Sequence, residues 1–312
     1  MLQNILPQFL TVLTQVLILL LLISIGFVLT KFKVLNDKGI KCITDIVLLL
    51  VTPCVIIKSF SREFEPKLFK QLLLSFLIAF LAHFIFIALS YLLMRCKNKS
   101  DNNVLRFGII FSNCGYMSIP LQQALLGDIG TFYGSSYIAI FNAVIWSYGI
   151  ILMSGDKKAL TPKKLLINPG IIGVLLGFII FVFSVNLPKP VFETVSYLAS
   201  LNTPLPMIII GFHLANSSIF DGIKDIRIIY SIFLKLIFFP LLALALLYLF
   251  GIRGDLLVSS VISVSAPTAA ITTMFSSKYN QNTPLSANLV SLSTIASLIT
   301  IPLIVTISQM IA

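Results

Sequence analysis

The sequence predicts an all-α integral membrane protein with ten transmembrane helices, built as two inverted repeats of five helices. Of its 312 residues, 58% are hydrophobic and only 11% are charged, whereas a soluble domain carries about 25% charged residues. The apolar residues gather in runs of about 20, the length that a helix needs to cross a bilayer core. Proline-containing motifs in the first five runs also have counterparts five runs later.

Ten apolar runs separated by short polar linkers are the predicted spans. They cover about residues 8–30, 40–60, 68–94, 105–126, 132–154, 168–185, 191–215, 226–250, 255–276 and 284–310. The first run is too long for the apolar region of a cleavable signal peptide, and no Lys or Arg precedes Lys31. We therefore interpret it as the first span.

The basic residues predict the orientation of the chain. Fifteen of the 22 Lys and Arg lie in loops after odd-numbered spans, six lie on the opposite side, and Lys235 falls within a span. Cytoplasmic loops carry the excess of basic residues. We therefore expect a multi-pass protein of the cell membrane with both termini outside the cytoplasm.

Several function classes do not fit this composition. A net charge of +11 would suggest a nucleic-acid partner in a soluble protein, but here the basic residues follow the membrane-topology pattern. The four cysteines form no CxxC pair and predict neither a disulfide nor a zinc site. No HExxH motif, nucleophile elbow or glycine-rich phosphate loop is present. We expect a lipid bilayer as the surroundings, and neither an enzyme, a cofactor nor a nucleic-acid partner.

Two halves of five spans follow from the spacing of the motifs. They are residues 1–154 and 168–312, joined by a cytoplasmic linker at 155–167. Because five is odd, the second half would enter the membrane from the opposite side. Inverted repeats of this kind are a common build of alternating-access transporters.

Two Thr-Pro pairs carry part of the repeat. Thr52 and Pro53 lie in the second span, and Thr203 and Pro204 lie in the seventh. We expect both pairs to bend their spans. The alternative is coincidence, because Pro is common in membrane helices.

The span at 105–126 holds the most informative motif. Asn113, Gly115, Ser118 and Pro120 fall within eight residues near its middle. Pro120 removes a backbone donor and clashes with the carbonyl four residues earlier, and Gly115 lets the backbone open. Non-helical backbone at this depth is tolerated only where protein or a water-filled cavity satisfies it. We therefore expect a broken helix that lines a cavity.

The span at 255–276 also has a proline near its middle, Pro267, which is flanked by Ser265, Thr268 and Thr272. We expect a second broken helix there. Two broken helices that face each other would place helix N-termini near mid-membrane. Such ends carry partial positive charge and free N–H groups, which suit a carboxylate. The alternative is two ordinary proline kinks whose backbone groups are satisfied by Ser and Thr hydroxyls.

Four ionisable residues fall within spans: Asp45, His83, His213 and Lys235. Charge inside a membrane is costly and points to function by default, so the first three are candidates for ion coupling and Lys235 for substrate binding. Each also has a structural interpretation. Asp45 could pair with Lys41 at the interface, the histidines could be hydrogen-bonded core residues, and Lys235 could extend to the interface or pair with backbone.

The stretch 113–121, Asn-Cys-Gly-Tyr-Met-Ser-Ile-Pro-Leu, resembles the Asn-x-x-x-Met-Gly-Ile-Pro-Leu motif of the auxin efflux carrier family. Bacterial members of that family include malate and malonate permeases. Ser118 stands where the family has glycine. The residues that match are Asn113, Met117, Ile119, Pro120 and Leu121.

Two further stretches support the resemblance. Pro267 is followed twelve residues later by Tyr279-Asn280, as in the family, and Thr272 stands where plant members have a second proline. Residues 144–148, Val-Ile-Trp-Ser-Tyr, are similar to the family's Ile-Ile-Trp-Tyr. Asn142 stands where a glutamine is often found.

The resemblance implies ten helices in two inverted repeats, with the fourth and ninth crossing at their broken points. It also implies that the protein transports organic anions and that it forms a homodimer. Two departures matter. The linker at 155–167 is far shorter than the cytoplasmic loop of many plant auxin carriers, which argues against auxin as the substrate. Asp45 stands where the family often has a basic residue, so no role is carried over there.

Together these observations predict a secondary transporter of a small mono- or dicarboxylate. Its site would combine the two broken spans. We expect these residues to line it: Asn113, Gly115, Ser118, Pro120, Asn142, Lys235, Ser265, Pro267 and Thr268. Proton or sodium coupling stays open. One alternative is a sodium-coupled symporter with the architecture of bile-acid symporters, and another is a membrane sensor without transport.

Overall fold

The computed structural model describes residues 2–156, 169–216 and 222–312, and this part of the chain is helical apart from turns and one isolated antiparallel bridge. In the first half the helices are α1 (Leu2–Lys31), α2 (Asp37–Ile46), η1 (Val47–Val51), α3 (Thr52–Phe60), α4 (Pro66–Leu93), α5 (Lys99–Ile110), η2 (Cys114–Ser118), α6 (Ile119–Leu126), α7 (Asp128–Val144), η3 (Ile145–Gly149) and α8 (Ile150–Ser154). In the second half they are α10 (Pro169–Val182), α11 (Lys189–Ser200), α12 (Pro204–Ala215), α14 (Ile226–Phe233), η5 (Leu234–Phe238), α15 (Phe239–Leu249), α16 (Gly254–Ser265), α17 (Ile271–Lys278) and α18 (Thr283–Ile311).

Seven helical stretches in the described residues are long and apolar enough to cross a membrane. They are Leu10–Lys31, Asp37–Phe60, Pro66–Leu93, Asp128–Ser154, Lys189–Ala215, Ile226–Leu249 and Thr283–Ile311. The prediction of an all-helical membrane protein is thereby confirmed. The predicted spans at 105–126 and 255–276 are each divided into two shorter helices, and the one at 168–185 contains only the short α10. Residues 157–167 of the predicted linker lie outside the described residues.

The outer surface of α4 shows why these helices need lipid. Leu73, Leu77, Phe80 and Phe84 are 48–64% exposed, and no charged residue follows Lys70 in this helix. A soluble protein does not present apolar side chains in such continuity. A bilayer is therefore the solvent that this surface fits.

Three prolines shape the helices in the same way. The π-helical turns η1, η2 and η5 each end one residue before a helix whose second residue is proline: Pro53, Pro120 and Pro240. In η1, for example, the Thr52 N–H donates to the Val47 carbonyl, five residues back. Proline has no N–H and its ring collides with the carbonyl four residues earlier, and the wider turn accommodates the ring without ending the helix. The Thr52–Pro53 pair therefore lies in a continuous helical stretch, whereas at Thr203–Pro204 the chain turns between α11 and α12.

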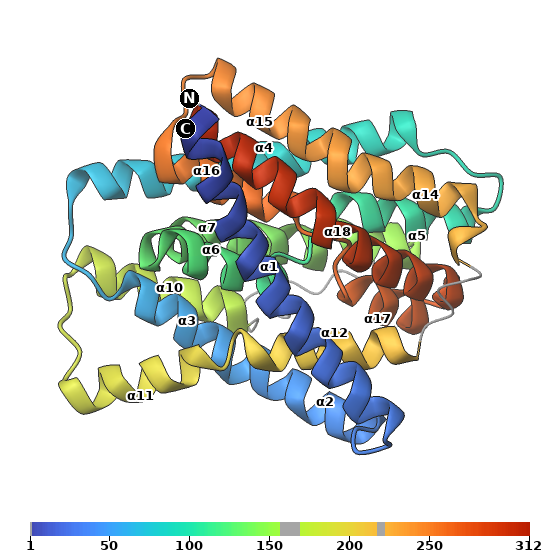
Figure 1. The fold of residues 1–312 in the computed structure, drawn as a ribbon, viewed down its shortest axis with the longest axis horizontal. Helices are drawn as coiled ribbons and strands as arrows, with labels where there is room; N and C mark the ends of the chain where they lie inside the picture. The colour runs from blue at the N-terminus through green and yellow to red at the C-terminus, as the bar shows by residue number, and fades with distance from the viewer. Residues whose placement is uncertain (1, 157–168, 217–221) are drawn as a thin grey trace.

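Figure 1 shows α1 running diagonally across the other helices, with its start beside the end of α18. Its main partner is α12, while α3 packs against α10 and α11. Helix α7 packs against α4, α6 and α16, and also contacts α3 and α10. These contacts place α6 and α16 in the interior, where the candidate site lies.

Two glycines set the distance between α1 and α12. A Cβ atom added to Gly26 would lie 2.4 Å from the Ile208 carbonyl oxygen, and one added to Gly211 would lie 2.1 Å from the Ile23 carbonyl oxygen. Both neighbours are backbone atoms that cannot rotate away. Small residues at such positions are a common way for membrane helices to pack closely.

We predict that Gly211→Ala forces α1 and α12 apart and lowers the free energy of unfolding by about 1–3 kcal/mol, as overpacking typically does. A fall in the melting temperature of the purified protein in detergent would be the sign. Gly39→Ala is the matched control, because its added Cβ would meet only the Asn36 side chain at an ordinary 3.5 Å. Equal melting temperatures for the two variants would contradict the close packing.

A polar network joins the first turns of α5, α14 and α18. The Arg227 guanidinium donates to Asp101 at 2.6 Å and to Asp225 at 2.6 Å, and the Asn282 amide donates to the other oxygen of Asp101 at 2.7 Å. The hydrogen bond from Arg227 lowers the pKa of Asp225 below its ordinary value, with burial acting weakly in the opposite direction. A lowered pKa means that Asp225 stabilises the fold above its unfolded-state pKa and loses this effect only as the pH falls through the folded-state value.

We predict that Asp101→Ala lowers the free energy of unfolding by about 1.5–3 kcal/mol, the usual range for hydrogen bonds to charged groups. Asp101 is only 7% exposed, so its partners lose bonds that water replaces poorly. Asp156→Ala is the control, because Asp156 is exposed. Thermal unfolding of both variants would test the claim, and an unchanged midpoint for Asp101→Ala would show that the network contributes nothing.

Candidate functional site

Both predicted spans are broken, the second around Pro267 and the first at residues 111–113, ahead of the expected opening at Gly115 and Pro120. Helix α5 ends at Ile110, and the chain is non-helical until η2 begins at Cys114. Helix α16 ends at Ser265, and α17 begins at Ile271. Each break releases backbone N–H and C=O groups that need partners in an apolar environment.

The two breaks supply those partners to each other. Ser112 and Thr268 form an isolated antiparallel bridge. The Asn113 N–H donates to the Pro267 carbonyl at 2.7 Å, and the Ala269 N–H donates to the Phe111 carbonyl at 2.9 Å. Segments more than 150 residues apart are thus joined by backbone hydrogen bonds between two helix breaks.

Side chains add further bonds around this pairing. The Thr268 hydroxyl donates to the Gly108 carbonyl at 3.1 Å, and the Thr268 N–H donates to the Ser293 hydroxyl at 3.2 Å. The Ser118 hydroxyl donates to the Ile262 carbonyl at 3.3 Å. Of the predicted site residues, Ser118, Pro267 and Thr268 therefore hold the two breaks together.

Some buried polar atoms beside the breaks have no partner among the described residues. They are Nδ2 of Asn113 and the hydroxyls of Ser265 and Thr272. Buried polar groups are almost always hydrogen-bonded to protein, water or a ligand. Two residues after Asn113, a Cβ added to Gly115 would meet no atom within 4 Å. The region of the first break therefore contains both unused hydrogen-bonding capacity and open space.

A polar cavity of about 180 Å³ lies between α3, the start of α6 and the turn from α11 to α12, and the residues of the break at 111–113 are not among those that line it. Predicted residues Pro120 and Thr203 line it, together with Lys58, Gln123 and Asn202. Asn202 is 4% exposed, and neither its amide nitrogen nor its oxygen has a partner in the described part of the chain.

Sequence reasoning missed Lys58 and Asn202. The charge pattern places Lys58 among the six basic residues on the extracytoplasmic side. In the structure Lys58 is half-buried in α3 and lines the cavity, with its Nζ 3.9 Å from Oδ1 of Asp128. Asn202 directly precedes the Thr-Pro pair of an otherwise apolar span. A lone Asn beside a predicted helix interruption is the signal that could have found it.

Other predicted residues lie apart from the cavity. Lys235 is fully buried and donates to the Ser112 hydroxyl, so it contacts the first break from the side of α14 and does not line the cavity. Asn142 is half-buried and donates to the Ile138 carbonyl of its own helix at 2.9 Å.

The candidates for ion coupling are scattered. His83 is buried, and its Nδ1 lies 2.8 Å from the Ala79 carbonyl. Asp45 and His213 are exposed. The ion pairs of the described residues do not include one between Asp45 and Lys41.

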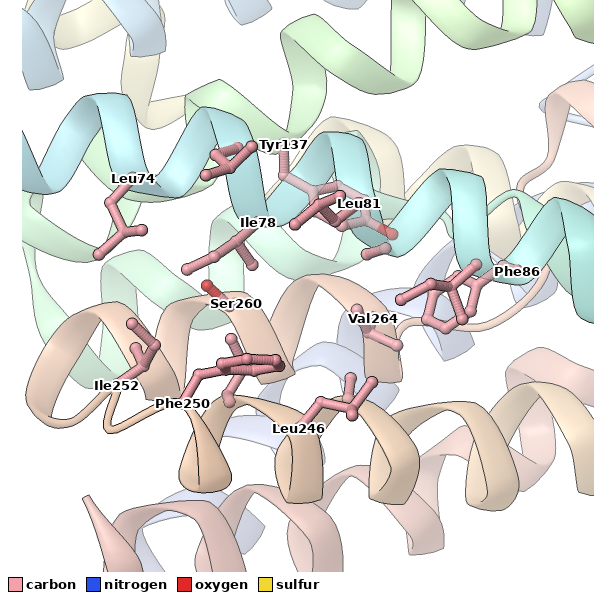
Figure 2. A pocket seen from close by; sticks show the side chains of 15 residues that line it. Leu74, Ile78, Leu81, Phe86, Tyr137, Leu246, Phe250, Ile252, Ser260 and Val264 are labelled. Carbon is pink, nitrogen blue, oxygen red and sulfur yellow. The ribbon is translucent and has the colours of Figure 1, made fainter.

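A second cavity, of about 430 Å³, lies on the flank of the molecule between α4, α15 and α16 (Figure 2). Figure 2 shows Leu74, Ile78 and Leu81 of α4 opposite Leu246 and Phe250 of α15. No charged side chain lines this groove. It suits apolar chains rather than a charged solute.

Comparison with known proteins identifies the family. A family model described as membrane transport protein matches residues 11–162 and 157–305. The chain belongs to this family. The match covers nearly the whole sequence and confirms the resemblance to auxin efflux carriers.

Two curated relatives extend over the same length as this membrane transport protein. An uncharacterized transporter from Methanothermobacter thermautotrophicus is 24% identical over 293 residues, which cover 92% of this chain and 95% of the relative. The uncharacterized transporter MJ1031 from Methanocaldococcus jannaschii is 25% identical over 303 residues, covering 92% and 96%. The family and these relatives place the protein among multi-pass membrane transporters.

Proposed function

We propose that this protein is a secondary transporter that moves a small organic anion, a mono- or dicarboxylate, across the cell membrane by alternating access. The observation that carries the proposal is the pair of joined helix breaks, with buried polar atoms next to them that have no partner among the described residues. Discontinuous helices at mid-membrane are where transporters of several folds bind their substrates.

The charge around the cavity favours an anion. Lys58 is the only ionisable side chain among the residues that line it. The residues that line the cavity include no carboxylate, although Asp128 lies 3.9 Å from Lys58 and partly offsets its charge. A cation in the cavity would therefore lie beside a lysine, and its desolvation would be unfavourable.

The position of the cavity supports alternating access. It lies between α3 and the α11–α12 turn on one side and α6 on the other. In this proposal α6 moves together with the joined helices α5, α16 and α17, while α3 and α12 stay in place. The movement would carry a bound anion along the surface that α3 and α12 form. Such a movement preserves the hydrogen bonds between the two breaks.

The remaining architecture is part of the same proposal. The chain forms two inverted repeats of five helices, 1–154 and 168–312, and the broken helices cross between them. The distribution of basic residues supports both termini outside the cytoplasm, and the family resemblance supports a homodimer. A sodium-coupled symporter is the second candidate, because half-helix C-termini also meet at the breaks.

We predict that the purified protein binds malonate or succinate, and that the matched neutral diamides bind at least about tenfold more weakly. The reason is that Lys58 favours negative charge by about 1.4 kcal/mol or more, which corresponds to that factor. Lys58→Gln should weaken dicarboxylate binding by about tenfold. Calorimetry or thermal shift would measure both effects.

Lys67→Gln is the matched control, because Lys67 is an exposed lysine on the following helix and does not line the cavity. Its affinity for dicarboxylate should equal that of the wild type. Equal binding of carboxylate and amide, or stronger binding of an organic cation, would overturn the anion assignment.

We predict that Asn113→Ala lowers uptake of the bound dicarboxylate into proteoliposomes by about tenfold or more and leaves the melting temperature nearly unchanged. The Asn113 Nδ2 has no partner in the described part of the chain, so its removal costs the fold little, whereas a substrate would lose a donor. Asn216→Ala, in an exposed position at the end of α12, is the control. Normal uptake by a normally folded Asn113→Ala protein would refute the role.

A further inference from the structure

Lys235 is buried in the middle of the protein without a carboxylate. It lies in η5, is fully inaccessible, and donates to the Ser112 hydroxyl at 2.5 Å. None of the ion pairs in the described residues includes it. The titratable side chains that interact with it electrostatically are His83 and Cys114, neither of which is an acid that balances a positive charge at neutral pH.

The surroundings of the Lys235 ammonium are nevertheless suited to a cation. Ser112 lies just beyond the C-terminal end of α5, and its hydroxyl lies 3.3 Å from the Val264 carbonyl, in the last turn of α16. Two half-helices of twelve residues each thus end beside the ammonium. The C-terminal end of a helix carries partial negative charge, and its last carbonyls lack helical partners.

A second hydroxyl lies at the same helix end. Ser265 follows Val264 and ends α16, and its buried hydroxyl has no hydrogen-bond partner in the described residues, Lys235 included. Hydroxyl and carbonyl oxygens are the ligands that small alkali cations take in proteins. Helix breaks of transporters use such carbonyls and half-helix C-termini to hold Na⁺.

We propose that the ammonium of Lys235 is a tethered cation that occupies, at the C-terminal ends of α5 and α16, the position a bound sodium ion would otherwise take. The side chain supplies a single positive charge and up to three N–H donors to oxygens that would otherwise lack a cation. It never leaves, so the protein needs no Na⁺ to keep the two breaks joined. The consequence for transport, independence of sodium, rests on the function proposed above.

The test compares the wild type with Lys235→Ala by thermal unfolding in equal concentrations of NaCl and choline chloride. The wild type should melt at the same temperature in both salts. In Lys235→Ala the emptied position is open to Na⁺, which binds only the folded state, so the melting temperature should be higher in NaCl by about 2–4 °C. Lys58→Ala, which removes a lysine from the polar cavity instead, should show no difference between the salts.

Stabilisation of the wild type by Na⁺ would overturn the proposal, and so would a folded Lys235→Ala protein that melts equally in both salts. A Lys235→Ala protein that is recovered only when purified in NaCl supports the proposal, and one recovered in neither salt contradicts it. Wild-type uptake in proteoliposomes should be equal with Na⁺ or choline outside. The melting experiments use no substrate, so failure to bind dicarboxylates would leave their result intact.

Discussion

The hydrogen bonds between the two helix breaks are the constraint on which the rest of the structure depends. A break in a membrane helix leaves backbone groups unsatisfied at a cost of several kcal/mol each. Here the segment at Ser112 and Asn113 pairs with the one at Pro267 and Thr268, so each break satisfies the other. Gly108 is part of this fit, because a Cβ there would collide with Leu289 at 2.4 Å and press on the Thr268 methyl group at 3.2 Å.

The same pairing separates the molecule's partial charges. The C-terminal ends of α5 and α16 meet near Lys235, whereas Lys58 lines a separate cavity that borders α6. The two lysines thus serve different parts of the proposed mechanism, one beside helix-end oxygens and the other beside the proposed anion. Dipoles fixed in this way need no reorganisation when a charged group arrives, which makes a low-dielectric site effective.

The sequence predicted well what periodicity and backbone chemistry control. Apolar runs gave the helical membrane protein, and Pro267 lies within the break between α16 and α17. The other break, at residues 111–113, precedes Pro120, which lies in the continuous stretch formed by η2 and α6. The sequence could not tell a proline that widens a helix, such as Pro53, from one that starts a new helix, such as Pro204. The outcome depends on what packs beside each one.

The contacts of individual side chains were harder to predict, because they also depend on which distant helices pack nearby. Lys58 near a span end is expected to reach water, but the turn between α11 and α12 lies beside it and encloses a cavity. Lys235 was placed correctly within a span, yet its partner Ser112 is 123 residues away and no local pattern names it. Long-range packing decides which oxygen a buried lysine meets.

A tethered cation has consequences for the energetics of transport that a bound ion does not. A coupling ion is bound on one side and released on the other, and its gradient contributes free energy to each cycle. Under the two proposals above, the ammonium of Lys235 returns with the protein and contributes none, and a carboxylate would cross as a net negative charge. Each such charge responds to the membrane potential with about 2.3 kcal/mol per 100 mV. At an interior potential of about −100 mV, that free energy would favour efflux up to an outside-to-inside concentration ratio of about 50 for a monocarboxylate, and of about 2,000 for a dicarboxylate, which carries two charges.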